Sequence, residues 1–145
     1  MGHKVCVIVN PASGRGAGAR ALPAIRAAFS SVGVSDVRLT SAKGDEAKQA
    51  RRALDDGFDT IVACGGDGTW SNVANGVLEA GAGRQARLAL LATGTGNDFA
   101  KTVGAPARDF GATARLAVEG ADMPVDVGRV EIGRASCRER VWIPV

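Results

Sequence analysis

The sequence is poor in aromatic residues. It contains no tyrosine, and phenylalanine and tryptophan together make up 4% of its 145 residues. Proteins that hold single-stranded nucleic acid usually stack its bases on aromatic side chains. The formal net charge is only +3, and the basic residues are scattered rather than gathered into a patch. The composition therefore argues against a nucleic-acid partner.

The sequence also lacks a long apolar run and a metal-like cysteine pattern. No segment approaches the roughly 20 apolar residues that a membrane-spanning helix needs, so we expect any lipid substrate to be met at the membrane surface. The three cysteines are Cys6, Cys64 and Cys137, and the first two lie in apolar runs typical of buried thiols. An odd cysteine count without a signal sequence favours a reducing cytoplasm.

Apolar, strand-like runs alternate with helix-like segments along the chain. Hydrophobic residues make up 46% of the sequence, enough for one domain with a core. The pattern predicts strands at 4–9, 36–40, 59–64, 86–92 and 124–130, and helices at 17–29, 43–55, 69–80, 96–103 and 108–119. This alternation predicts an α/β fold, a three-layer sandwich in which helices cover both faces of a mostly parallel sheet.

Glycine-rich turns follow three of the predicted strands. They are NPASGRGAG (10–18) after the first, GGDGT (65–69) after the third and TGTGND (93–98) after the fourth. In parallel sheets the carboxyl ends of the strands share one edge, where ligands bind. Glycine turns that lead into helices expose backbone N–H groups to anions. We therefore predict one phosphate-binding site built from all three turns.

Asp67, in the middle of the second turn, needs a separate explanation. A carboxylate repels a phosphate unless a cation lies between them, so Asp67 indicates Mg²⁺, bound directly or through a water. It could also accept the proton of an attacking hydroxyl. The alternative is structural, with glycines that only form tight turns and Asp67 capping the helix predicted at 69–80.

Two common nucleotide-binding motifs do not fit these turns. No lysine follows any of them as a phosphate loop requires. The GTGND stretch lacks the full GxGxxG spacing and the acidic residue that would bind a dinucleotide ribose.

Four stretches together resemble the catalytic domain of the diacylglycerol kinase family, which includes bacterial lipid kinases and sphingosine kinases. They are Asn10-Pro11-Ala12-Ser13-Gly14, Gly65-Gly66-Asp67-Gly68-Thr69, Asn75-Gly76 and Gly94-Thr95-Gly96-Asn97-Asp98-Phe99-Ala100. The resemblance runs from residue 4 to about 130 and implies a fold similar to that of NAD kinases and diacylglycerol kinases. The chain departs from the family at three positions. Trp70 lies where an aliphatic residue is common, and Ser71 lies where an asparagine is common. Thr93 lies where a glycine or an aliphatic residue is common.

The resemblance implies a Mg²⁺-dependent lipid kinase of phospholipid metabolism. Such an enzyme transfers the γ-phosphate of ATP to the hydroxyl of diacylglycerol or a related lipid, acting peripherally at the membrane. Asp67 would be the catalytic and Mg²⁺-binding residue. The implied ATP-binding residues are Asn10, Pro11, Ala12, Ser13, Gly14, Thr40, Gly65, Gly66, Asp67, Gly68, Thr69, Gly94, Thr95 and Asn97.

The last residues, 131–145, do not resemble the family. The stretch EIGRASCRERV is what a common short-read sequencing adapter encodes when it is translated. We therefore expect a nucleotide-binding domain over 1–130 and a non-native tail over 131–145. The β-rich second domain of the family, with its lipid site and further acidic residues, would be missing, and the fragment alone would be inactive.

Two other functions stay open at this point. An NAD kinase shares the GGDGT turn, but NPASG and GTGNDFA argue against it. A non-catalytic nucleotide-binding module would not need Asp67.

Overall fold

The computed structural model describes residues 2–81, 86–94, 96–106, 108–131 and 134–144, and the side chains of these residues except 129–139. The strands are β1 (Val5–Val9), β2 (Val37–Leu39), β3 (Thr60–Gly65), β4 (Arg87–Ala92), β5 (Asp122–Glu131) and β6 (Arg134–Pro144). The helices are α1 (Ser13–Ser30), α2 (Asp45–Asp55), α3 (Asp67–Glu79), α4 (Asp98–Thr102) and α5 (Phe110–Glu119).

The strands form one sheet in the order β2-β1-β3-β4-β6-β5. The first four are parallel, and β5 and β6 form an antiparallel pair. Strand β6 meets β4 in parallel through a single residue pair, Arg87 and Trp142. The mixed α/β fold with a mostly parallel sheet is therefore confirmed.

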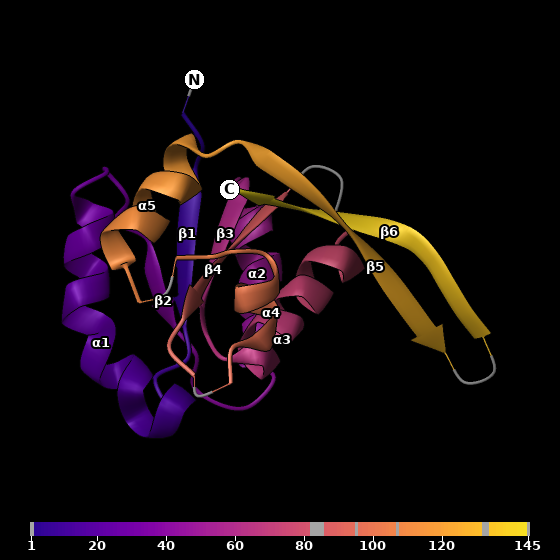
Figure 1. Cartoon of the computed structure of the whole chain (residues 1–145), viewed down its shortest axis with the longest axis horizontal. Coiled ribbons are helices and arrows are strands. Elements are labelled where there is room, and N and C mark those ends of the chain that lie inside the picture. The colour runs from indigo at the N-terminus through magenta and orange to yellow at the C-terminus, as the bar shows by residue number, and fades with distance from the viewer. Residues whose placement is uncertain (1, 82–85, 95, 107, 132–133, 145) are drawn as a thin grey trace.

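Two cores lie on opposite faces of the sheet, because successive side chains of a strand point to opposite sides. In β1, Val5, Val7 and Val9 belong to the core under α1 and α5. Cys6 and Ile8, between them, belong to the core under α2, α3 and α4. Figure 1 shows the two groups of helices on either side of the sheet. This burial on both faces explains why β1 is a continuous apolar run.

Two helices begin earlier than the sequence pattern predicts. Helix α1 begins at Ser13 rather than at residue 17, and its first turn is interrupted by left-handed backbone at Gly14, Arg15 and Gly16. Helix α3 begins at Asp67, two residues before the predicted start. Both starts fall inside glycine turns, where the pattern of apolar residues gives no indication of a helix.

Strand β6 occupies residues that the sequence left without a pattern. It pairs with β5 along most of its length, and Figure 1 shows this hairpin extending beyond the body of the domain. Near its end, Val141 and Ile143 are buried in the core. A ladder of backbone hydrogen bonds does not require an alternating side-chain pattern, so the strand was not visible in the sequence.

Helices α2 and α3 cross closely at Gly76. A Cβ at this position would lie 2.5 Å from the carbonyl oxygen of Ala47 in α2. We expect Gly76→Ala to lower the free energy of unfolding by about 1–3 kcal/mol, because neither backbone can move away without disturbing the core. Gly68→Ala, in the same helix, is the control, since nothing lies within 4 Å of the added methyl. Urea unfolding measures the stability of both variants. Equal stabilities would contradict the close approach of the two helices at Gly76.

Cys6 and Cys64 are both buried, as predicted. Burial, together with a hydrogen bond from its thiol to Asp36, raises the pKa of Cys6 to about 12. Burial alone raises the pKa of Cys64. In a Cys137→Ser variant at pH 9, where an exposed thiol would be largely ionised, we therefore expect no reaction with a chromogenic disulfide until urea unfolds the chain. Fast labelling of the folded variant would contradict this result.

Candidate functional site

The three glycine turns meet at one edge of the sheet. The backbone N–H of Asn10 donates to the carbonyl of Cys64 at 3.0 Å, and that of Thr93 donates to Gly65 at 3.0 Å. The hydroxyls of Ser13 and Thr93 are hydrogen-bonded at 2.8 Å, which joins the first turn to the third. The convergence predicted from parallel strands is confirmed by these contacts.

Glycine is required where the turns touch. Gly14 has a φ of +57°, and a Cβ there would lie 2.3 Å from the carbonyl oxygen of Thr93. A Cβ on Gly94 would lie 2.6 Å from the Cα of Gly66. Side chains at these positions would push the turns apart, so the glycines set how closely the three backbones approach one another.

Asn10 connects the first turn to the second. Its side-chain oxygen accepts from the N–H of Ala12 at 3.0 Å, and its amide donates to the hydroxyl of Thr69 at 3.1 Å. Pro11 accepts at its carbonyl from the N–H of Ala19, which ties the turn to α1. Both ends of the Asn10 amide therefore help to hold the turns together.

Asp67 lies in the first turn of α3, and its carboxylate faces the start of α4. One carboxylate oxygen accepts from the backbone N–H of Asp98 at 3.1 Å, and the other accepts from that of Phe99 at 3.2 Å. The structural alternative considered above had Asp67 capping its own helix; in the structure it caps α4 instead. Each oxygen has a further lone pair, so these bonds do not prevent it from binding a cation.

The remaining predicted residues lie around this cluster. Thr40 is buried at the end of β2, and its N–H donates to the carbonyl of Val9 at 3.0 Å, which places it beside the start of the first turn. Gly68 is exposed in the first turn of α3, and Asn97 is half-buried at the start of α4. Thr95 lies outside the described residues.

The contact between Trp70 and Phe99 is a feature of the site that was not predicted from the sequence. Their rings contact each other with centroids 3.9 Å apart. The N–H of Phe99 is one of the two that Asp67 binds, so this ring contact and the Asp67 hydrogen bonds together hold α4 against α3. Phe99 belongs to a motif stretch and Trp70 directly follows one, but nothing in the sequence indicated that they touch.

A metal at this site would rely on Asp67. Among the residues that the structure describes, no three His, Cys, Asp or Glu side chains gather as a metal cluster. Mg²⁺ is commonly bound in nucleotide sites by one or two carboxylates, with substrate phosphates and waters filling its other positions. The single carboxylate beside the glycine turns therefore fits a Mg²⁺ that arrives with a nucleotide.

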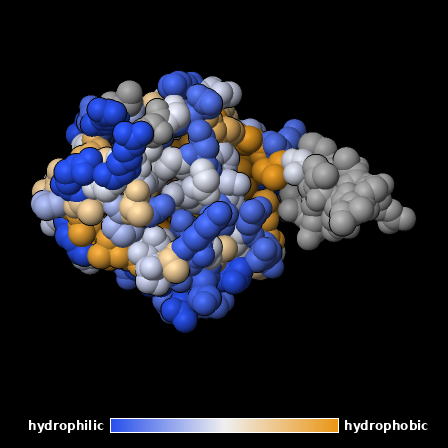
Figure 2. Space-filling view, turned by 90° about the horizontal axis from the view of Figure 1, so that it is seen from below, coloured by the Kyte–Doolittle hydropathy of each residue, from blue (hydrophilic) through white to orange (hydrophobic). Residues whose placement is uncertain are grey.

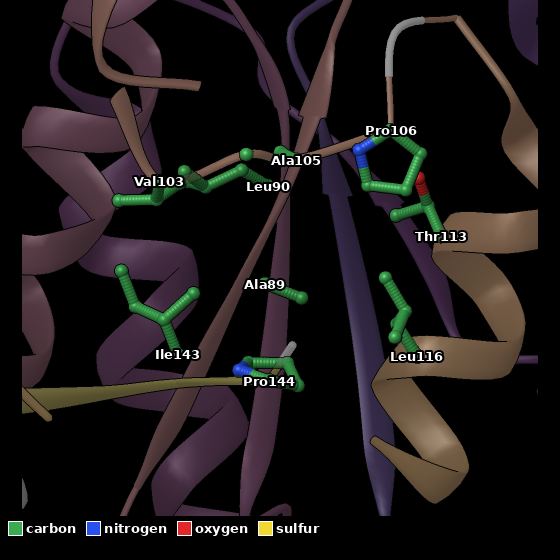
Figure 3. A pocket seen from close by; sticks show the side chains of 10 residues that line it. Ala89, Leu90, Val103, Ala105, Pro106, Thr113, Leu116, Ile143 and Pro144 are labelled. Atoms are coloured by element: carbon green, nitrogen blue, oxygen red, sulfur yellow. The ribbon is translucent and has the colours of Figure 1, made fainter. Parts of the chain in front are cut away.

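A cavity lies away from the turns. It is an apolar cavity of about 110 Å³, and Figure 3 shows its walls coming from β4, the segment after α4, α5 and the end of β6. The hydroxyl of Thr113 on its wall already donates to the carbonyl of Asp109. No charged side chain lines this cavity, so it offers no chemistry for phosphate or metal.

In the part of the chain that the structure describes, no helix has both the length and the apolar character to span a bilayer. Figure 2 shows hydrophilic residues over most of one face, with an apolar area next to the hairpin.

Comparisons with known proteins agree with this geometry. Residues 4–130 match the model of the diacylglycerol kinase catalytic domain. The chain is 42% identical over 94 residues to a "Probable lipid kinase YegS-like" protein of Klebsiella pneumoniae, covering 65% of this chain and 31% of that protein. It is 34% identical over 125 residues to the diacylglycerol kinase of Bacillus subtilis, covering 86% of this chain and 41% of that protein.

A solved structure extends the likeness to the fold. A diacylglycerol kinase from Bacillus anthracis superposes with a TM-score of 0.70 at 32% identity, over 88% of this chain and 44% of that one. The chain thus spans less than half the length of these relatives. The match over residues 4–130, and the fold shared over most of the chain, establish that it belongs to the diacylglycerol kinase catalytic domain family.

Proposed function

We propose that the chain is the ATP-binding half of a lipid kinase, which phosphorylates the hydroxyl of diacylglycerol or a related lipid at the membrane surface. The observation that carries the proposal is the meeting of three glycine turns beside the carboxylate of Asp67. Backbone amides that can approach a phosphate closely, next to a carboxylate suited to Mg²⁺, are the arrangement that phosphoryl transfer needs.

In this proposal each part of the site has its own role. The turns at 10–14 and 65–69 bind the phosphates through backbone N–H groups, and Thr40, Thr95 and Asn97 contact the rest of the nucleotide. Asp67 holds the Mg²⁺, directly or through a water. Mg²⁺, when bound, neutralises charge on the phosphate oxygens. The residues of this chain position the nucleotide, and positioning accounts for much of the rate enhancement in phosphoryl transfer.

Gly66 offers a sharp test of phosphate binding by this chain. A Cβ there would lie 3.5 Å from the Cα of Gly94, an ordinary contact, so Gly66→Ala should fold normally. Its methyl would nevertheless fill space between the second and third turns. We expect at least tenfold weaker binding of Mg-ATP by calorimetry, about 1.4 kcal/mol. Gly111→Ala in α5, with no neighbour closer than 3.6 Å, is the control. Equal ATP affinity in the two variants would contradict the proposed phosphate site.

We also propose that residues 131–145 are a non-native tail and that a β-rich second domain is missing. The family match ends at residue 130, and the chain covers 31–41% of the curated relatives described above. Such a chain would bind nucleotide but transfer phosphate poorly. Sequencing the parent locus past Val130 tests this directly, because a frame that continues with β-rich sequence and new carboxylates is the expected result.

The complete protein distinguishes the lipid kinase from the alternatives. We expect transfer from Mg-ATP to a lipid in a panel that includes diacylglycerol and sphingosine, and none to NAD. Phosphorylation of NAD would identify an NAD kinase. Nucleotide binding without transfer to any acceptor would indicate a non-catalytic module.

A further inference from the structure

Two buried polar atoms near Asp67 have no hydrogen-bond partner among the described residues. They are the indole nitrogen Nε1 of Trp70 in α3 and the side-chain oxygen Oδ1 of Asn97 at the start of α4. Both residues line one small cavity, whose other walls include the apolar side chains of Ala63, Leu90 and Leu91. Buried polar groups in folded proteins nearly always have a partner, so this pair requires one.

The two atoms have complementary hydrogen-bonding roles, because one belongs to a donor and the other is an acceptor. Trp70 is held by its contact with the ring of Phe99. The Asn97 amide donates to the carbonyl of Gly94 at 2.7 Å, and turning the amide over would bring two oxygens together there. The free end of the amide is therefore the oxygen Oδ1, which can only accept, while the indole can only donate.

We propose that this cavity binds a single water molecule, which accepts a hydrogen bond from the Trp70 indole and donates one to Asn97 Oδ1. The partner must both accept and donate, which excludes a cation beside the indole N–H and an anion beside Oδ1. The cavity measures about 10 Å³, close to the least volume that holds one water and too small for a base or a ribose.

This water would connect α3 to the third glycine turn. Asp67 lines the same cavity, and its hydrogen bond to the start of α4 also connects α3 to this segment. The water would fix the side chain of Asn97, a residue proposed above to contact the nucleotide.

The two tryptophans of the chain allow a direct test. In a ¹⁵N-labelled sample of the full chain, Trp70→Phe and Trp142→Phe assign the two indole N–H resonances. We expect the Trp70 indole proton to show a cross-peak to water, with the sign of a molecule bound for longer than nanoseconds. We also expect Trp70→Phe, which keeps an aromatic ring against Phe99, to shift the side-chain amide resonances of Asn97.

A crystal structure of the chain provides the second measurement. The expected result is one water within about 2.7–3.2 Å of both Trp70 Nε1 and Asn97 Oδ1. A protein atom at that position, or a Trp70 indole without a cross-peak to water, would overturn the proposal. Neither measurement uses kinase activity, so the result stands apart from the proposed function.

Discussion

Replacing Asp67 with asparagine in the complete protein is expected to abolish phosphoryl transfer while the protein stays folded. The carboxamide oxygen can still accept from one N–H at the start of α4, where the carboxylate accepts from both Asp98 and Phe99. The negative charge that the proposal assigns to Mg²⁺ binding is lost. Because charge stabilisation at such sites is worth a factor of about 10²–10³ or more, kcat should fall at least that far. A radiometric assay with Mg-ATP and diacylglycerol measures it.

Asp67→Ala should have a second effect that the asparagine variant largely avoids. It leaves both N–H groups at the start of α4 without their acceptor, and loss of a helix cap costs about 0.5–2 kcal/mol. Asp55→Asn, at the exposed end of α2, is the charge-matched control and should change neither activity nor stability. Turnover near normal in Asp67→Asn would rule out the assigned role of the carboxylate.

Loss of the Arg87 side chain is expected to be the most destabilising single change in the domain. Arg87 begins β4, and its guanidinium is buried at the opposite end of the strand from the glycine turns. It donates to the carbonyls of Ala117 and Gly120 at 2.8 Å each and pairs with Asp122 at 2.6 Å. These partners lie at the end of α5 and the start of β5, so one side chain joins three elements.

Arg87→Met should therefore lower the free energy of unfolding by about 3–5 kcal/mol, because it leaves buried acceptors unpaired. Urea unfolding followed by circular dichroism measures the change. Arg51→Met provides the matched control, since the side chain of Arg51 is 40% exposed and pairs with the exposed Glu79. That pair should be worth less than about 1 kcal/mol. Similar losses in the two variants would contradict the role of Arg87 as a buried junction.

The strands and the meeting of the turns could be predicted because both have strong sequence patterns. Strands buried on both faces, such as β1 and β3, contain unbroken apolar runs, VCVIV and IVAC, each followed directly by a turn. Once the strands are parallel, their carboxyl ends must share an edge, which brings residues 10–14, 65–69 and 93–98 together. The position of the site therefore followed from strand direction, without knowledge of any single contact.

The partner of Asp67 and the role of Arg87 could not be predicted in this way. Asp67 binds backbone N–H groups 31 and 32 residues away, and backbone groups look alike in every sequence. Arg87 lies at the start of an apolar run, and its acceptors, two backbone carbonyls and the side chains of Thr60 and Asp122, lie 27–35 residues away in the sequence. The sequence therefore predicted that the three turns meet, but it did not indicate how their side chains are used.

The order of the strands has a consequence for synthesis of the chain. Strand β1 is entirely buried between β2 and β3, yet both of these neighbours come later in the sequence. Its long partner β3 emerges about 50 residues later, which at ~5–20 residues per second is a delay of seconds. During that time the segment VCVIV has at most the short strand β2 as a partner, and the edge that will meet β3 is open on a growing chain. A nascent-chain chaperone that shields it until Gly65 has emerged would protect the step at which this domain is most open to aggregation.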